Sequence, residues 1–499
     1  MPQSSERIVA PVPSQKAAAI TPATFGRSRI RWVLLLTFVG AVLRLLHLGA
    51  KSLWYDEPLT VAIARLSWPS FTHLWHYGEA AYQGAYFLLM RGWLHLGQSE
   101  AWIRLPSAIF AIASIPLIYV LARRLIGDRA ALAAAAILAF SPTDVYYSQE
   151  ARGYTLGILL VLLSSWFFVR AVQEGRKRDW WLWTVFSALA IYSHFFTSLV
   201  VVAQGASLLV LREAKLWRRV IAYGALIVLL TAPGLPFLFR GAPAQVPSLL
   251  QWPRATPKEL LHLALFLGGS GEKLVLSAIL WIAALRAIGR ERAEQNRGMF
   301  WRGALLILWA VVPILLLALI SIANPLFVQR YMIFCLPATV MLAARGMIAL
   351  PQHRIGLWLV VALCVFSLVN VFLGYAKPRE DWRGATSAVI AAAAPGDAVL
   401  IFPFFARTGF DYYYDRDGAP ELRTFPRFYD RGEEEQDFER ALKANPHAFQ
   451  HVWIMMRDQG PGKNSLSDYA PGLEAKLEAI CGEPRVRKYQ GITVLEFGR

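Results

Sequence analysis

The chain has 499 residues, of which 56% are hydrophobic and 17% charged, and its formal net charge is +17. Soluble globular proteins are only about 45–50% apolar, so this composition argues against a soluble enzyme. A strongly basic chain could bind nucleic acid, but here the basic residues form short clusters between apolar runs. That arrangement is typical of membrane proteins with positively charged cytoplasmic loops, so we exclude nucleic acid as a partner.

The N-terminal residues 1–31 contain scattered Pro, Ser and Ala, with Pro11, Pro13 and Pro22 among them. This composition predicts a disordered cytoplasmic leader. The apolar run that follows has no small-residue cleavage site, which favours an uncleaved first membrane span over a signal peptide.

Apolar segments follow in chain order and predict eleven membrane spans. They cover about 32–48, 101–122, 130–142, 154–171, 180–194, 196–211, 219–238, 273–288, 303–323, 331–349 and 355–374. The segments near 130, 180 and 196 are shorter than the roughly 20 residues that a perpendicular helix needs, so tilting or packing inside the bundle is expected.

The loops between these segments predict the orientation. Clusters of arginine and lysine follow the second, fourth, sixth and eighth spans, at about 123–129, 170–178, 212–219 and 286–302. If the spans alternate, all four clusters and the N-terminus lie on the cytoplasmic side, and an odd number of spans places the C-terminus outside. We expect a multi-pass protein of the plasma (inner) membrane.

Two regions on the outer side differ in composition from the spans. The first outer loop, 49–100, is rich in Trp and Tyr, which predicts helices lying at the headgroup level. Residues 375–499 carry 17 basic and 19 acidic residues and turn soluble. Strand-like runs at 398–405, 451–456 and 492–497 alternate with helical patterns at 438–445 and 472–480, which predicts a small extracytoplasmic α/β domain.

The sequence SLWYDEP, Ser52 to Pro58, lies directly outside the first span. Asp56 and Glu57 precede a proline suited to the first turn of a helix, whose positive end favours an ionised carboxylate. Such an anion could deprotonate an acceptor hydroxyl or amine. The alternative is that the two acids only cap the helix in water.

Four stretches in this order resemble the GT-C glycosyltransferases, specifically the bacterial relatives of protein O-mannosyltransferases and aminoarabinose transferases of lipid A. They are VLRLLHLGAKSLWYDEP (Val42 to Pro58), WIRLPSAIFAIASIPLIYVLARRLIGDRAA (Trp102 to Ala131), SPTDVYYSQEARGYTL (Ser141 to Leu156) and FVQRYMIFCLPA (Phe327 to Ala338). The resemblance implies a helical polytopic membrane fold of GT-C type, with 32–374 as the catalytic domain.

The resemblance also implies a sugar donor carried on a polyprenyl phosphate and a site at the outer membrane boundary. By motif position, Asp56 would be the general base and Glu57 a supporting or substrate-positioning carboxylate. Displacing a lipid phosphate requires stabilising negative charge, and Arg152 and Arg330 are the candidate phosphate ligands. Snorkelling to headgroups is the alternative for both arginines. Tyr331, which follows Arg330 in the motif, is a further candidate.

Three other residues carry charges or imidazole nitrogens close to the predicted site. Arg44 lies within the first span, where a charge needs a partner; it could bind the donor phosphate or pair with Glu150. Glu150 could orient Arg152 or take part in a cation site, so a divalent cation is a candidate cofactor. His194 could hold a phosphate, a metal or a sugar hydroxyl, or be a polar residue satisfied within the fold.

One motif departs from the family pattern. Many relatives have a His-Pro-Pro or Gln-Pro-Pro-like turn, where this chain has YQGAYF, Tyr82 to Phe87. Gln83 could keep the turn, but contacts inferred from the missing prolines do not carry over.

The sequence therefore predicts a membrane glycosyltransferase that moves a monosaccharide, mannose or another hexose, from a polyprenyl-phosphate donor to a glycan, lipid or protein acceptor outside. Membrane lipids are the remaining expected partners. A transporter or lipid-linked-sugar flippase without transferase chemistry is the rival interpretation, because many spans with intramembrane arginines also suit translocation. A catalytically inactive scaffold is the third.

Overall fold

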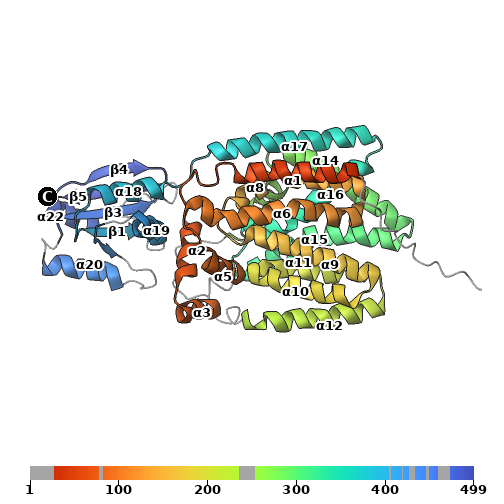
Figure 1. Cartoon of the computed structure of the whole chain (residues 1–499), viewed down its shortest axis with the longest axis horizontal. Helices are drawn as coiled ribbons and strands as arrows, with labels where there is room; N and C mark the ends of the chain where they lie inside the picture. The colour runs from red at the N-terminus through yellow and green to blue at the C-terminus, as the bar shows by residue number, and fades with distance from the viewer. Residues whose placement is uncertain are drawn as a thin grey trace, which may run out of the picture.

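The computed structural model describes residues 27–77, 83–234, 253–403, 406–417, 420–425, 433–445, 449–458 and 472–498. It shows a bundle of long helices joined to a smaller unit built on one β-sheet, with short helices crossing between them (Figure 1). The predicted leader lies mostly outside the described residues. Its last residues, however, already belong to a helix, because α1 begins at Arg27 and continues into the apolar run.

Each of the eleven predicted apolar segments contains a helix, although several helices end one to three residues before the predicted limit. The helices are α1 (Arg27–Leu45), α6 (Glu100–Ile126), α7 (Asp128–Ala139), α9 (Tyr154–Glu174), α10 (Lys177–Ser193), α11 (Ser198–Ser207) with the flanking turns η1 (Phe195–Thr197) and η2 (Leu208–Val210), α12 (Ala214–Thr231) with η3 (Ala232–Gly234), α14 (Glu272–Ala293), α15 (Arg297–Ala323), η5 (Gln329–Cys335) with α16 (Leu336–Ala349), and α17 (His353–Ala376).

Not every one of these helices is long enough to cross a membrane. Six are long and apolar enough, or up to eight if two sharply bent pairs each form one span. The pairs are α7 with α8 (Pro142–Ser148), bent by 53°, and α13 (Pro257–Gly268) with α14, bent by 84°. The sequence gives no signal for these bends. By length and composition the described helices thus give six to eight spans, compared with the eleven predicted.

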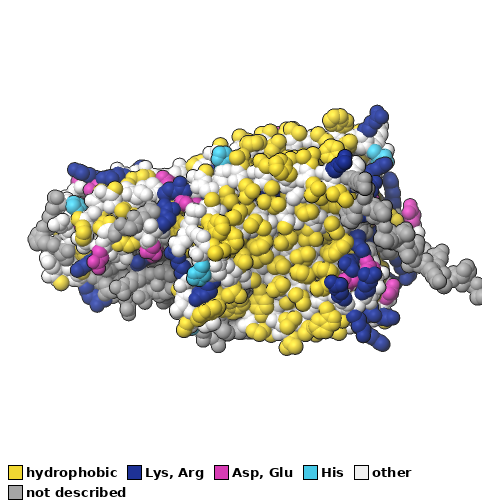
Figure 2. Space-filling view, in the orientation of Figure 1, with side chains coloured by type: hydrophobic (Ala, Val, Ile, Leu, Met, Phe, Trp, Pro, Cys, Tyr) yellow, Lys and Arg dark blue, Asp and Glu magenta, His cyan; other side chains and the backbone are white. Residues whose placement is uncertain are grey.

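The outside of the bundle is apolar, as expected for a surface that faces lipid. Figure 2 shows a broad hydrophobic band over the bundle, with Lys and Arg gathered at the end remote from the sheet unit. Large side chains such as Leu34, Val228 and Trp358 are more than half exposed along this band. Inside, small residues allow close packing: a Cβ added at Gly346 of α16 would overlap the backbone of Leu280 in α14.

The predicted outer loop forms short helices that lie across the end of the bundle (Figure 1). They are α2 (Asp56–Arg65), α3 (Trp68–Tyr77) and α5 (Gly84–Trp93). Arg91 of α5 donates to the carbonyl oxygen of Ala64 and lies 4.3 Å over the ring of Trp68, so it ties the three helices together.

The C-terminal unit has a five-stranded sheet in the order β2-β1-β3-β5-β4. The strands are β1 (Ala398–Phe402), β2 (Arg423–Phe425), β3 (His451–Arg457), β4 (Arg485–Tyr489) and β5 (Ile492–Gly498), and the helices are α18 (Trp382–Ala392), α19 (Arg407–Asp417), α20 (Glu433–Ala444) and α22 (Leu473–Cys481). β1 pairs in parallel with β2 and β3, and β5 pairs antiparallel with β3 and β4.

Side chains join the sheet unit to the bundle. The Tyr413 hydroxyl of α19 accepts a hydrogen bond from the backbone N–H of Leu53 at 2.8 Å, and Arg383 of α18 forms an ion pair with Glu100 at 2.8 Å. Lys51 donates to the carbonyl oxygens of Gly374 and Lys377. The segment just before α2 is thereby held from both sides.

Candidate active site

Asp56 lies in the first turn of α2, where the end of the helix meets the loop between α8 and α9 and the start of η5. Its side chain is 7% exposed, and its Oδ2 atom lies 3.4 Å from Nη1 of Arg330. Arg152, in the 149–153 loop, places Nη1 at 3.5 Å from both the Asp56 carbonyl oxygen and the Thr60 hydroxyl. The fold therefore brings together the base and both phosphate ligands expected from sequence.

The two arginines keep donor capacity. Within the described ranges, the Nε atoms of Arg152 and Arg330 are buried and have no hydrogen-bond acceptor. Burial alone would lower the pKa of Arg152, but the Asp56 carboxylate outweighs this effect and holds the pKa above its ordinary value. Asp56 thus lies beside two guanidinium groups that can still bind an anion.

A group of rings borders this cluster. His194 is 1% exposed, and its ring centroid lies 5.4 Å from that of Tyr154 and 5.5 Å from that of Tyr331. No described residue hydrogen-bonds either ring nitrogen of His194, and the Tyr154 hydroxyl is also unpaired in this part of the chain. Within the described residues, His194 is therefore not satisfied by the fold, and it leaves buried polar atoms next to Tyr154 and Tyr331.

Gln83 holds the loop that carries Arg152. Its Oε1 accepts a hydrogen bond from the backbone N–H of Gly153 at 3.0 Å, and its side chain is buried. A Cβ at Gly153 would approach the carbonyl oxygen of Ser193 to 2.8 Å. Gln83 and Gly153 thus position the 149–153 loop against the end of α10, next to His194.

Glu57 was expected to support Asp56 in catalysis. In the structure it forms a buried ion pair with Arg104. Both its oxygens accept hydrogen bonds from Arg104 of α6 at 2.7 Å, and Oε1 also accepts from the backbone N–H of Ala151 at 3.0 Å. Burial by itself would raise the pKa of Glu57, but the charges of Arg104 and Arg379 outweigh it and hold the pKa below its usual value.

Arg104 was not among the residues singled out from sequence. Besides Glu57, it donates to the carbonyl oxygens of Leu48, Lys51 and Ser52, so it fixes the whole segment before α2. An arginine inside an apolar span was the available signal, as it was for Arg44.

Arg44 does not reach the Asp56 cluster. Its guanidinium is fully buried, forms an ion pair with Asp144 of α8, and donates to the carbonyl oxygens of Gly40, Leu138 and Ala139. The structure thus pairs Arg44 within the fold and does not bring it to Arg152 and Arg330, so its phosphate-binding role stays a prediction. A structural pair was the alternative, but its partner is Asp144 and not Glu150, because α8 bends back over the end of α1.

Glu150 lies behind the cluster, fully buried. Among the described residues, its polar neighbours are the Tyr146 hydroxyl, which makes no hydrogen bond of regular geometry with it, and Arg379, which lies 3.7 Å from Oε1. Burial raises the pKa of Glu150 to about 7, against the opposing charge of Arg379. No three His, Cys, Asp or Glu side chains in the described ranges lie close enough together to hold a metal ion, so the cation site stays a prediction.

Comparisons with known proteins were made by sequence and by structure. The family model described as dolichyl-phosphate-mannose-protein mannosyltransferase matches residues 85–237. No curated protein matches the sequence.

Solved structures match almost the whole chain. ArnT from Cupriavidus metallidurans in the apo state has a TM-score of 0.64 at 14% identity, covering 94% of this chain and 98% of ArnT. The form of ArnT bound to undecaprenyl phosphate has a TM-score of 0.58 at 14% identity, covering 93% and 98%. The oligosaccharyltransferase of Archaeoglobus fulgidus has a TM-score of 0.51 at 11% identity, covering 85% of this chain and 69% of that enzyme. The chain therefore shares its fold with these membrane glycosyltransferases over most of its length, and it matches the mannosyltransferase family model over residues 85–237.

Proposed function

We propose that the chain transfers a monosaccharide from a polyprenyl-phosphate carrier to an acceptor on the outer side of the membrane, with Asp56 as the general base. The observation that carries this proposal is the Asp56 carboxylate beside Arg152 and Arg330, two guanidinium groups with unused donors. Two neighbours support the donor class: ArnT binds undecaprenyl phosphate, and the matching family is described by dolichyl-phosphate-mannose.

The charges suit the reaction step by step. Asp56 accepts the proton of the acceptor hydroxyl or amine, whose oxygen or nitrogen then bonds to C1 of the sugar. The bond between C1 and the phosphate oxygen breaks, and the carrier leaves as a phosphate monoester. Its charge rises from about −1 in the diester to about −2 in the monoester, and Arg152 and Arg330 stabilise the charge that develops.

His194 and Tyr331 line the same space and offer ring surface and polar atoms to the sugar. Asp56, Arg152 and Arg330 act on the acceptor proton and the phosphate. The choice of sugar, mannose or another hexose, and of acceptor therefore depends on other side chains. Aromatic faces beside polar atoms are typical of ligand sites.

The test is sugar transfer by the purified full chain, reconstituted with undecaprenyl-phosphate-linked radiolabelled mannose and membrane lipid extract. Asp56→Asn should fold normally and lose about 10²- to 10⁴-fold in rate. The matched control is Asp415→Asn, since Asp415 is an exposed carboxylate on α19, in the sheet unit. Full activity of Asp56→Asn would remove the proposed base.

The same experiment separates the transferase from a flippase. A transferase forms a new labelled glycoconjugate, whereas a flippase only moves the labelled carrier between leaflets. Movement without a new conjugate, for each sugar carrier supplied, would replace the transferase proposal with the translocation one.

A further inference from the structure

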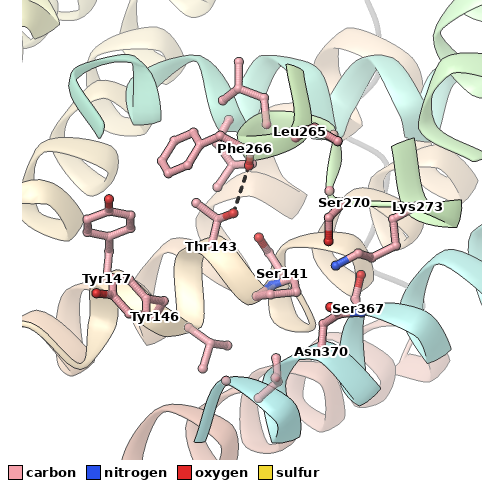
Figure 3. Close-up of a pocket in the computed structure, with 18 of the residues that line it drawn as sticks. Ser141, Thr143, Tyr146, Tyr147, Leu265, Phe266, Ser270, Lys273, Ser367 and Asn370 are labelled. Atoms are coloured by element: carbon pink, nitrogen blue, oxygen red, sulfur yellow. Dashed lines mark hydrogen bonds between the residues drawn. The ribbon is translucent and has the colours of Figure 1, made fainter. Parts of the chain in front are cut away.

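A cavity of about 530 Å³ lies beside the Asp56 cluster, between α8, the α13–α14 bend, α16 and α17. Figure 3 shows residues from these elements around it. Asp56, Arg152 and Arg330 do not line the cavity. Tyr147 does, and its ring lies 4.9 Å from that of Tyr154, which belongs to the group of rings beside the Asp56 cluster.

The cavity lining is apolar over most of its area, and all its charged side chains are positive. Phe266, Trp281, Leu336, Val340 and Leu363 supply hydrophobic surface, and no acidic residue occurs among the described lining residues. The lining includes four cationic side chains, at Lys51, Lys273, Lys377 and Arg379.

Two of the four cations already have partners. Lys51 donates to two carbonyl oxygens, and Arg379 faces Glu57 and Glu150 at 3.7 Å. Lys273 is different: it is 3% exposed and lines the cavity, and none of the hydrogen bonds or ion pairs among the described residues involves its amino group. In Figure 3 that amino group points into the space shared with Ser141, Ser270 and Ser367.

The position of Lys273 makes an unpaired ammonium costly. It lies in the first turn of α14, where the helix dipole repels a cation, and Lys377 adds a second positive charge nearby, although the adjacent carboxylate of Glu272 acts in the opposite direction. A buried charge is tolerated when it is paired. An anion seated among Lys273, Lys377 and the serine hydroxyls would remove both penalties and would gain attraction from the end of α14.

The apolar lining of the cavity favours an anion attached to a lipid over a free anion. Two helices that line the cavity, α14 and α17, carry exposed apolar side chains such as Val275 and Phe366. A hydrocarbon chain can therefore continue along the apolar lining, which includes Phe266, Leu336 and Leu363, while the charged head reaches Lys273. We propose that this cavity binds the phosphate headgroup of a membrane lipid, separately from the donor phosphate at Arg152 and Arg330.

The test is native mass spectrometry of the full chain released from detergent, with dioleoyl phosphatidic acid as the probe. Lys273→Gln and Lys377→Gln should each weaken retention of the probe about tenfold, the size expected for one charge-assisted contact. Lys258→Gln is the matched control, because Lys258 is an exposed lysine of α13 outside the cavity lining. Lys377 is also exposed, so its substitution tests the site even if Lys273→Gln does not fold.

Three outcomes would overturn the proposal. Equal retention by wild type, Lys273→Gln and Lys377→Gln would remove the cationic site. Equal retention of dioleoyl phosphatidylcholine would mean that the cavity holds lipid chains without reading the phosphate. Displacement of the probe by inorganic phosphate at millimolar concentration would identify a free-anion site. Arg330→Gln should leave probe retention unchanged, so a failure of the donor proposal is distinguishable from a failure of this one.

Discussion

Two adjacent acids have different environments because successive helical residues point about 100° apart. Asp56 faces the two arginines of the candidate site, and Glu57 faces Arg104 and the backbone N–H of Ala151. The sequence DE therefore contains one candidate base and one buried anchor. The motif alone does not show which acid has which role. The roles depend on Arg104 of α6 and on the 149–153 loop, which are distant in sequence.

Glu150 should make the stability of the chain depend on pH. Its pKa is about 7 in the folded chain and near the ordinary value of about 4.3 when unfolded, so the folded state binds the extra proton. The stabilising contribution is full below the unfolded pKa and is lost as pH rises through about 7. Glu150→Gln should therefore raise the thermal midpoint at pH 8 and change it little at pH 5.

The measurement is thermal unfolding of the detergent-solubilised full chain at both pH values. Glu294→Gln serves as the control, since Glu294 is an exposed acid at the end of α14. A shift of the same size at pH 5 and pH 8 would contradict the assigned titration.

At the scale of elements, the loop between α8 and α9 fits tightly against the end of α10. Gly153 has a φ of −70°, which any residue can adopt, so the reason for glycine there is space and not a left-handed conformation. Gly153→Ala would push the carbonyl oxygen of Ser193 or move the loop that carries Arg152. Because small displacements of catalytic groups are costly, transfer should fall by about 10²-fold while the protein remains folded.

Gly205→Ala is the matched substitution, because a Cβ at Gly205 in α11 meets nothing within 4 Å. Both proteins are compared by transfer rate and by the fraction that elutes as a folded monodisperse species. Activity of Gly153→Ala equal to that of Gly205→Ala would show that the loop adjusts without moving Arg152.

Elements also differ in how well the sequence predicts them. β1, β3 and β5 are buried, and their apolar runs predicted them; β2 has only three residues, and β4, RVRKY, is largely exposed. Asp56, Arg152 and Arg330 were predicted from short motifs. The partner of Arg44 and the cavity around Lys273 were not predicted. They depend on the 53° bend between α7 and α8 and on the 84° bend between α13 and α14, for which the sequence has no short motif.

At the scale of the whole molecule, the orientation in the membrane remains a prediction that the mechanism requires. In a Cys481→Ser background, Ser70→Cys places one thiol on an exposed position of α3. A membrane-impermeant maleimide should label it in intact spheroplasts, because we expect α2 and α3 to lie outside. Exposed Arg178, in the first turn of α10, offers the opposite control as Arg178→Cys, which should react only after permeabilisation. Labelling in the reverse order would place Asp56 in the cytosol and exclude an outward acceptor.

The ion pairs of Arg379 join the two parts of the molecule at one point. This residue, three positions after the end of α17, lies 3.7 Å from both Glu57 and Glu150. A chain cut at the end of α17 would lose that guanidinium and leave Glu150 deep in the protein without a neutralising neighbour. The two parts are therefore not interchangeable modules: grafting another C-terminal unit onto this bundle would succeed only if the graft supplied an arginine at the same place.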